Sequence, residues 1–282
     1  MQFSFTSEQE EFRSILRRFL EDKSPPTVVR RLMETEAGWD RESWRELNQQ
    51  LGLTAVHIPE AYGGQGFGPV ELGIVLEEMG RALLCAPYFS STVLAATAIM
   101  NAGSEAQKRD LLPGIAAGDT IATLAFTEPN GRWDAEGIEL TATAAGGKYR
   151  VDGVKSFVLD GHTADLIVVI ATGDKGLSFF TVPGDAPGLT RRALKVMDPT
   201  RKQARLEFRG LVVGDAARFS QCRLLAFLRR DLGLRRRGRR RQIRKIDRVD
   251  LAVFHFFLAV VDCIAEEGKL AAVRRSDQRV DA

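Results

Sequence analysis

The stretch FTEPNGRWD, residues 126–134, holds side chains well suited to bind a small molecule. Thr127 offers a hydroxyl and an amide directly after an apolar run, TIATLAF, that is typical of a strand. Trp133 places a large ring in a loop, and Phe157 offers a second ring one predicted hairpin later. A flat heteroaromatic ligand uses such rings for stacking and such donors for its polar edges. Ordinary packing of a β-domain explains the same residues equally well, so both interpretations stay open.

Other kinds of site find little support in the sequence. There is no phosphate-binding G-x-x-x-x-G-K-[ST] loop and no strand–GxGxxG–helix unit. The histidines have no partners at metal-ligand spacing, so we expect neither a metal site nor a Ser-His-Asp triad. These residues are His57, His162 and His255. The Gly-rich segment 63–68 is interpreted as a close turn between two helices, in preference to a ligand loop.

Residues 1–119 are predicted to form an all-α domain. Apolar residues recur at the spacing of one buried helix face near the start of the chain. They are Phe12, Ile15, Leu16, Phe19 and Leu20. Ser7, with Glu10 three residues on, is predicted to cap this first helix. The last helix of the domain is predicted to end at Pro113-Gly114.

Residues 120–214 are predicted to form an all-β domain. Short runs rich in β-branched and aromatic residues follow one another with no helix between them, which is typical of an antiparallel barrel or sandwich. Asp152-Gly153, between KYRV and VKSFVL, is interpreted as a two-residue hairpin turn. The predicted fold class is therefore α+β, with an N-terminal helical domain followed by an antiparallel β-barrel or sandwich domain.

Residues 215–282 match neither pattern and form an atypical basic tail. The net charge of the chain is +3, yet residues 223–248 hold 12 of its 40 Lys and Arg and two of its acidic residues. This block fits a solvated charge run, a patch for RNA, DNA or an anionic membrane, or a different reading frame fused to a truncated protein. The abrupt change of charge and period favours the third interpretation. Nucleic-acid binding is disfavoured because interleaved aromatic residues are missing. We expect a frameshifted or disordered tail.

Composition and termini indicate a cytoplasmic protein without a membrane span. Three scattered cysteines, Cys85, Cys222 and Cys263, argue against a disulfide framework. The opening MQFSFTSEQEEFR lacks the basic and apolar regions of a secretory signal. The apolar run LAVFHFFLAVV (251–261) is too short to cross a bilayer.

Three motifs, in this order, resemble the acyl-CoA dehydrogenase family. They are IPEAYGGQGFG, AFTEPNGRWD and VDGVKSFVLDGHTADLIVV, preceded by FTSEQEEFR, and the resemblance covers residues 1 to about 215. It implies an N-terminal helical domain, a β-domain and a C-terminal four-helix domain. FAD is then expected between the last two domains, with an acyl-CoA thioester against the flavin. The C-terminal helical domain is expected to be missing from this chain or replaced.

The resemblance also implies five cofactor-binding residues. Phe126 and Thr127 stand where a Thr-Glu-Pro segment of the family meets the flavin ring. Phe157 and Leu159 stand where the family commonly has Trp-Ile-Thr-Asn-Gly, so the stacking ring is kept and a side-chain hydroxyl is lost, although the Leu159 amide can still donate. Trp133 stands in the place of a small Gly-Ser-Asp sequence, which changes the space for the substrate or for CoA.

The implied activity is α,β-dehydrogenation of an acyl-CoA in fatty acid or lipid metabolism, with an electron-transfer flavoprotein as the electron acceptor. The family's catalytic Glu lies on the C-terminal helices, and no residue here is assigned that role. Glu266 and Glu267 lie in the tail outside any family motif, and Glu128 is interpreted as a structural member of its loop. Three functions are compared: a truncated, inactive dehydrogenase; a non-catalytic partner subunit in a homo- or hetero-oligomer with a complete homologue; and a basic-tail nucleic-acid-binding protein.

Overall fold

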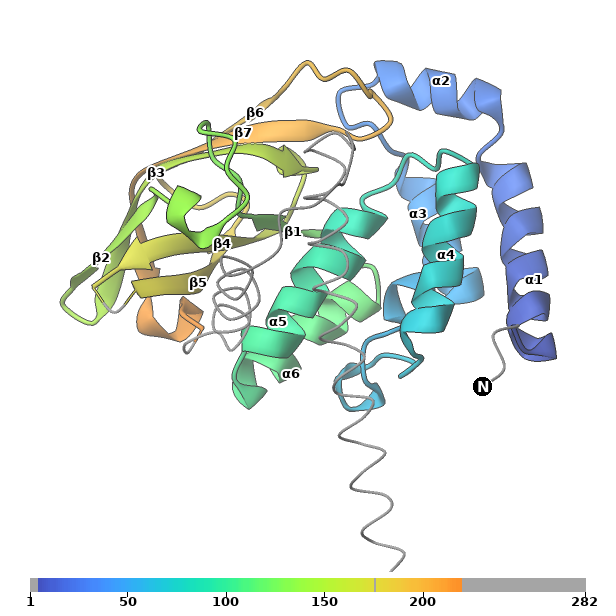
Figure 1. Ribbon diagram of the computed structural model, residues 1–282, viewed down its shortest axis with the longest axis horizontal. Coiled ribbons are helices and arrows are strands. Elements are labelled where there is room, and N and C mark those ends of the chain that lie inside the picture. The colour runs from blue at the N-terminus through green and yellow to red at the C-terminus, as the bar shows by residue number, and fades with distance from the viewer. Residues whose placement is uncertain (1–4, 175, 220–282) are drawn as a thin grey trace, which may run out of the picture. The chain divides into compact units, whose positions relative to one another are not determined.

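The computed structural model describes residues 5–174 and 176–219. By its contacts the chain divides into two units, residues 1–226 and 227–282, and the second unit lies outside the described residues. Within the first unit the helices come first and the strands follow (Figure 1). The predicted order of a helical part followed by a β part is therefore confirmed.

The helical part is built from several short helices, with a main buried cluster and a smaller one that includes Val29 and Leu32. Within the described residues these helices are α1 (Ser7–Lys23), α2 (Pro26–Glu34), α3 (Arg41–Leu51), α4 (Pro69–Arg81), α5 (Ala96–Ala102) and α6 (Glu105–Ala116). A π-helix, η3 (Phe89–Ala95), leads directly into α5. The predicted apolar stripe of α1 is buried at Leu16 and Leu20, which join the core with residues of α3 and α4.

Two helix ends differ from the predictions. Thr6 caps α1, one residue before the predicted Ser7, because its hydroxyl accepts the Gln9 amide at 3.3 Å and the Gln9 side chain accepts the Thr6 amide at 3.0 Å. This Thr-x-x-Gln pair satisfies two helix-end donors at once. Helix α6 continues through Pro113 to Ala116, since a proline this close to the end removes a single helical hydrogen bond.

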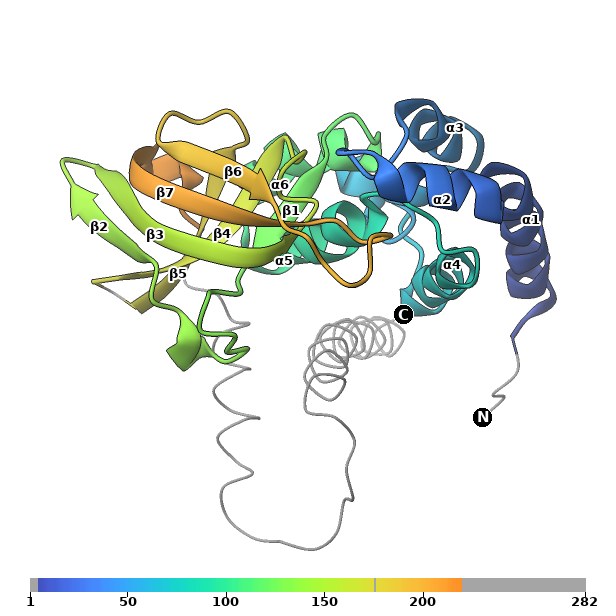
Figure 2. The ribbon, with the colours of Figure 1, turned by 90° about the horizontal axis from the view of Figure 1, so that it is seen from above.

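The strands form a mixed sheet that curls into a half-barrel. They are β1 (Ala122–Ala125), β2 (Thr141–Ala145), β3 (Lys148–Leu159), β4 (Leu166–Gly173), β5 (Gly176–Pro183), β6 (Leu189–Ala193) and β7 (Gln203–Gly214). The hydrogen-bonded order is β1-β4-β2-β3-β7-β6, and β5 pairs with β4. Strands β3 and β7 run side by side (Figure 2).

The pairing of β1 with β4 corrects the predicted fold class. These two strands run parallel, whereas β2–β3, β3–β7, β6–β7 and β4–β5 are antiparallel. Parallel neighbours need a long connection, and here residues 126–165 supply it with a loop and the β2–β3 hairpin. The prediction of a purely antiparallel barrel or sandwich is wrong in this respect.

The hairpin between β2 and β3 turns at Gly146-Gly147. Both glycines have positive φ, 57° and 77°, as a two-residue turn between twisted strands requires. The predicted turn at Asp152-Gly153 is wrong, because both residues lie inside β3 at a shift of its register against β7. Gly153 supplies the positive φ of 138°, and the Asp152 carboxylate accepts the Gly210 amide of β7 at 2.6 Å. This Asp-Gly pair forms a β-bulge in place of a turn.

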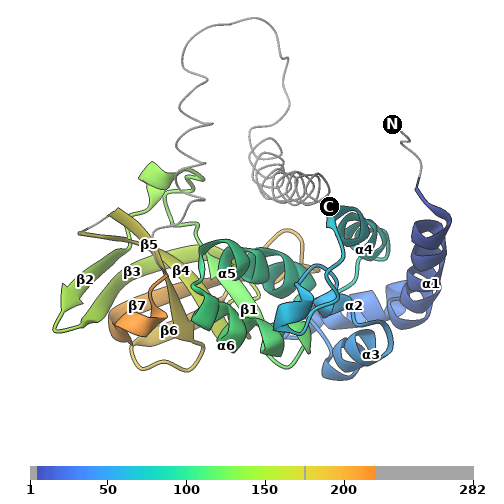
Figure 3. The ribbon, with the colours of Figure 1, turned by 90° about the horizontal axis from the view of Figure 1, so that it is seen from below.

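The π-helix η3 fixes β1 from the helical side. Figure 3 shows α5, which continues η3, beside β1. The Ser91 hydroxyl accepts the Ala122 amide of β1 at 3.0 Å. The Ser90 hydroxyl donates to the Asp160 carboxylate at 2.6 Å, just beyond the end of β3. The starting point of the loop after β1 is therefore set by contacts with the helices.

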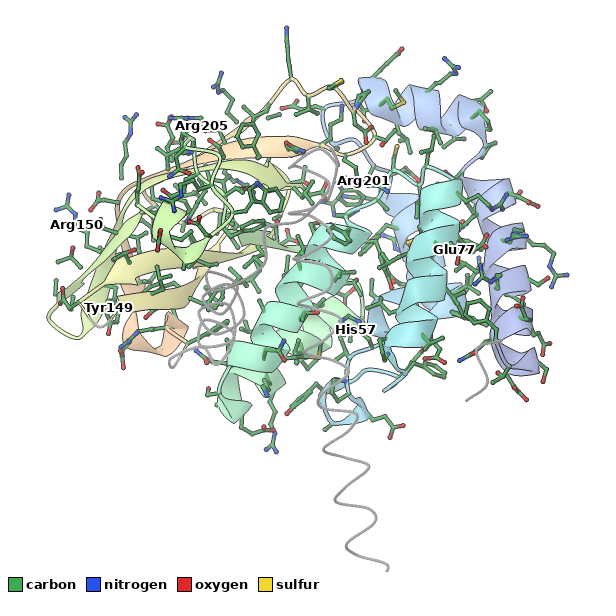
Figure 4. All side chains as sticks on the ribbon, viewed as in Figure 1. His57, Glu77, Tyr149, Arg150, Arg201 and Arg205 are labelled. Carbon is green, nitrogen blue, oxygen red and sulfur yellow. The ribbon has the colours of Figure 1, made fainter. Side chains whose placement is uncertain are left out.

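The described start of the predicted tail, residues 215–219, packs on the sheet. Phe219 is buried, and its amide donates to the Phe179 carbonyl at 2.9 Å. Arg218 donates to the Tyr149 hydroxyl at 2.9 Å (Tyr149 is labelled in Figure 4). The reading-frame and nucleic-acid interpretations concern residues outside the described ranges. Among the described residues, every helix is too short or too polar to cross a membrane.

A buried carboxylate joins α1 to α4. Glu78 accepts hydrogen bonds from Arg17 at 2.6 and 2.9 Å, from Arg81 at 3.0 Å and from Arg13 at 3.4 Å. The bonds from Arg17, followed by those from Arg81, lower the pKa of Glu78 to about 2. Because the folded pKa lies below the ordinary 4.5, this carboxylate stabilises the fold above pH 4.5. Its contribution is lost as the pH falls toward 2.

We predict that Glu78→Gln lowers the free energy of unfolding at pH 7 by about 2 kcal/mol, because three arginines lose their charged acceptor. The neighbouring Glu77, labelled in Figure 4, is 63% exposed and pairs with Arg13, so Glu77→Gln is the matched control and changes it by less than about 0.5 kcal/mol. Denaturant titrations check both values. The difference between Glu78→Gln and the wild type shrinks between pH 4.5 and 2; a constant difference contradicts the role of the charge.

Candidate functional site

The loop after β1 is fastened to β3 at Thr127. Its hydroxyl donates to the Ser156 carbonyl at 2.8 Å, and its own carbonyl accepts the Ser156 amide at 2.9 Å. Thr127 is buried, and its amide makes no hydrogen bond within the described residues. A buried main-chain donor normally has a partner, so this amide is a candidate for contact with a ligand.

A buried ion pair lies directly behind this loop. The Lys155 ammonium group is 2.7 Å from the Glu128 carboxylate, and both side chains are almost fully buried. Glu128 also accepts the amides of Glu139 and Leu140, at 2.9 and 3.0 Å. Burial lowers the pKa of Lys155 to about 8, against the effect of its carboxylate partner. These contacts support the interpretation of Glu128 as a structural residue.

Lys155 is the residue of this site that the sequence analysis missed. It stands in a strand segment, VKSFVL, whose neighbours Val154 and Ser156 gave no reason to expect a buried charge. A lysine close to Val154, Phe157 and Val158 was the available signal, since lysine is almost never fully buried without a partner. The acid 27 residues away that pairs with it could not be chosen from the sequence.

Two of the predicted site residues, Trp133 and Phe126, lie against each other. Their ring centroids are 5.2 Å apart and the planes meet at 74°, an edge-to-face pair. Trp133 is still 43% exposed. Its loop is held by Arg132, which pairs with Asp134 at 2.9 Å and with Glu136 at 3.0 Å. An indole held in this way offers an aromatic surface next to Phe126.

Phe157 is presented to solvent by a distortion of β3. Its φ is 60°, in the left-handed region that a bulky residue seldom adopts, and the register against β7 shifts between Lys155 and Val158. Phe157 is 50% exposed. Backbone strain of this kind collects at ligand sites, where the surrounding structure holds it in place.

Leu159 lies at the end of β3, next to the start of β1. Its carbonyl accepts the hydroxyl of Thr123 from β1 at 2.6 Å. This bond and the Thr127–Ser156 bonds bring the two segments that carry the predicted site residues to one end of the sheet. Phe126 contacts Trp133, and Thr127 is bonded to Ser156 of β3. The assignment of all five residues to flavin binding stays a prediction.

Asp160 follows Leu159 and is buried against the π-helix. Its carboxylate accepts the Ser90 hydroxyl, and its carbonyl accepts the amides of Thr163 and Ala164, each at 3.0 Å. Burial raises the pKa of Asp160 to about 6, although the Ser90 bond and the charge of Arg201 act in the opposite direction. The site is therefore joined to the helical part through a carboxyl group that is protonated in mildly acidic solution.

The two described histidines make their hydrogen bonds outside this site. His57 Nε2 lies 3.4 Å from the Thr97 hydroxyl, and burial lowers the pKa of His57 to about 4. His162 Nε2 lies 2.9 Å from the Glu36 carbonyl. Within residues 5–174 and 176–219, three or more His, Cys, Asp or Glu side chains do not gather as a metal site. His255 lies outside the described residues.

Two family models match this chain in sequence. The N-terminal domain of acyl-CoA dehydrogenase matches residues 6–119, and the middle domain of acyl-CoA dehydrogenase matches residues 123–210. Together they cover the helical part and nearly all of the sheet. The chain belongs to the acyl-CoA dehydrogenase family, and the prediction made from its motifs is confirmed.

Curated relatives share this part of the chain. Isovaleryl-CoA dehydrogenase of Pongo abelii is 30% identical over 194 residues, which are 66% of this chain and 46% of that protein. Acryloyl-CoA reductase (NADH) of Anaerotignum propionicum is 31% identical over 198 residues, 67% of this chain and 50% of that protein. The chain thus spans about half the length of the curated relatives it matches.

Solved structures agree with the fold. The ChsE4–ChsE5 complex from Mycobacterium tuberculosis is similar with a TM-score of 0.72 and 30% identity, covering 81% of this chain and 61% of that one. An acyl-CoA dehydrogenase complexed with FAD from Bacillus anthracis gives a TM-score of 0.73 at 25% identity, covering 79% of this chain and 40% of that one.

We predict that Asp160→Asn changes how stability depends on pH. The folded pKa of Asp160, about 6, lies above the ordinary 3.8, so the wild type loses stability from this group as the pH rises through that window. The variant lacks this loss, and its stability relative to the wild type should rise by roughly 2–3 kcal/mol between pH 4 and pH 7. Denaturant titrations of both proteins at several pH values measure it. The opposite contribution of His57 is common to both proteins and cancels; a difference independent of pH contradicts the prediction.

Proposed function

We propose that this chain binds FAD at the end of β1 and β3 and serves as the FAD-binding part of an acyl-CoA dehydrogenase. The observation that carries the proposal is the Thr127 amide, which lacks an acceptor within the described residues. Thr127 is bonded to Ser156, the residue before the half-exposed Phe157. It follows Phe126, whose ring contacts the half-exposed Trp133. The residues present fit a flavin, whose flat ring can stack on Phe157 and whose polar edge can accept from Thr127.

Family membership supports the choice of ligand. The relatives include an acyl-CoA dehydrogenase from Bacillus anthracis complexed with FAD and a glutaryl-CoA dehydrogenase from Mycobacterium smegmatis in complex with FADH2, both 25% identical in sequence. We extend FAD binding to this chain, with Phe126, Thr127, Trp133, Phe157 and Leu159 as the contact residues. Trp133 is proposed to border the space for the substrate or for CoA, where its ring takes more room than a small residue would.

The proposed reaction is α,β-dehydrogenation of an acyl-CoA, with an electron-transfer flavoprotein as the acceptor. When bound, FAD would supply the two-electron oxidation. The chain's own part is to hold the ring by Phe157, to donate from the Thr127 amide, and to exclude water with the Phe126–Trp133 pair. The catalytic base is left unassigned, since Glu266 and Glu267 lie outside the described residues. The cytoplasm is the proposed location.

A partner subunit is the second candidate function. The similarity to the ChsE4–ChsE5 complex, an assembly of two different chains, is the observation that favours it. In that case this chain would contribute its sheet to an oligomer with a complete homologue. Co-purification with a second dehydrogenase chain supports this function, and a monomer that binds FAD alone contradicts it.

The absorbance spectrum of the purified protein tests the first proposal. We expect the visible bands of bound flavin. If this chain also supplies the catalytic base, the bands should bleach when an acyl-CoA is added. A colourless protein that stays colourless after FAD is added and the excess removed contradicts FAD binding. Flavin bands that no acyl-CoA bleaches support FAD binding and contradict dehydrogenase activity of this chain by itself.

We predict that Phe157→Gly weakens FAD binding about tenfold, because the stacking ring is lost. The free energy of unfolding should change by less than about 1 kcal/mol, because glycine relieves the left-handed backbone while removing a half-exposed ring. Fluorescence titration with FAD and denaturant unfolding measure the two effects.

Phe179→Ala is the control for Phe157→Gly. It removes a buried ring of β5 and should lower the free energy of unfolding by about 3 kcal/mol. A stability loss of that size in Phe157→Gly would contradict the view that its ring is held out for a ligand.

A further inference from the structure

Lys155 makes two contacts, and both reach the loop after β1. Its ammonium group donates to the Phe126 carbonyl at 3.2 Å and to the Glu128 carboxylate at 2.7 Å. Its side chain is fully buried, so water does not share these bonds. A single cation therefore fixes the main chain on one side of Thr127 and a side chain on the other.

Stability alone does not explain this ion pair. Removing two charges from water costs several kcal/mol per ion, and a well-packed apolar pair is often as stable. Glu128 also fixes the backbone at Glu139 and Leu140, so the pair joins the loop, the entry to β2 and β3. Such an arrangement places a backbone segment in one position, which suits a site that must be formed before its ligand arrives.

The Phe126 carbonyl and the Thr127 amide belong to the same peptide group. A hydrogen bond from a cation to the carbonyl polarises this peptide and makes its N–H a stronger donor. As described above, this N–H has no acceptor within residues 5–174 and 176–219. The cation thus acts, through one peptide group, on the N–H that is proposed to meet the ligand.

We propose that Lys155 is a positioning residue that orients and polarises the Phe126–Thr127 peptide, so that the Thr127 amide donates a strong hydrogen bond to the flavin ring. The proposal rests on the FAD binding proposed above. In this proposal the buried lysine contributes to packing, tightens FAD binding and raises the reduction potential of the bound flavin.

The test compares the wild type with the double variant Glu128→Gln/Lys155→Met. The double variant removes the cation without leaving a buried carboxylate unpaired, and the Gln oxygen can still accept a loop amide. We expect the Kd for FAD to rise about tenfold, the size expected for one charge-assisted hydrogen bond. The reduction potential of the bound flavin should also become more negative, because a weaker donor stabilises the reduced ring less. Lys148→Met, at an exposed lysine of the same strand, should leave both values unchanged.

Each outcome separates this proposal from the one on which it rests. If the wild type binds no FAD, the proposed function fails and the role of Lys155 fails with it. If the double variant unfolds at a lower denaturant concentration but binds FAD with the wild-type Kd and potential, Lys155 is structural and the inference alone is overturned.

A measurement on the wild type covers the case in which the variant does not fold. The amide proton resonance of Thr127 should move downfield when FAD saturates the protein, as a strengthened donor requires. A Thr127 amide that does not respond to saturating FAD overturns the proposal.

Discussion

A buried ion pair between Glu128 and Lys155 is the interaction on which the candidate site depends. The two groups lie 2.7 Å apart in a region that excludes water, where the loss of either partner would leave the other charge uncompensated. Through its further bonds the pair holds the Phe126 carbonyl and the amides of Glu139 and Leu140. The loop that carries Phe126 and Trp133 is therefore anchored to β3 and to the entry to β2, and its exposed side is where we propose that the ligand binds.

The same end of the sheet is held from the helical part. Ser91 of the π-helix accepts an amide of β1, and Ser90 donates to Asp160, directly after Leu159. The Thr123–Leu159 bond then joins β1 to the end of β3. A π-helix is rare and is often found at functional positions, and here two of its polar residues, Ser90 and Ser91, bind the two segments that carry the site. The site thus depends on both parts of the chain.

Local patterns were sufficient for some features and insufficient for others. The change of period near residue 120 and the order of the motifs predicted the helical part, the β part and the family. Turn chemistry was ambiguous, because Gly146-Gly147 and Asp152-Gly153 both suit a two-residue turn and strand register decides between them. The parallel β1–β4 pair and the Glu128–Lys155 pair join residues far apart in sequence, and local patterns do not say which residue is the partner. The aromatic residues of the site were visible as residue types, but the strained φ of Phe157 was not.

Three energetically unfavourable features occur within six residues of β3 and its end. Lys155 is a buried cation, Phe157 has a left-handed backbone, and Asp160 is a buried carboxyl group whose pKa is raised to about 6. Each of the three features lowers the stability of the folded protein. For the backbone strain at Phe157 the cost is on the order of 1–3 kcal/mol. Consistent sequences avoid such conflicts except where a site needs them. The contacts around the segment compensate for these costs: Glu128 neutralises the lysine, β7 pairs with the distorted strand and Ser90 satisfies the carboxylate. These contacts hold the segment while Phe157 stays half-exposed, which suits the stacking of a flat ligand that we propose.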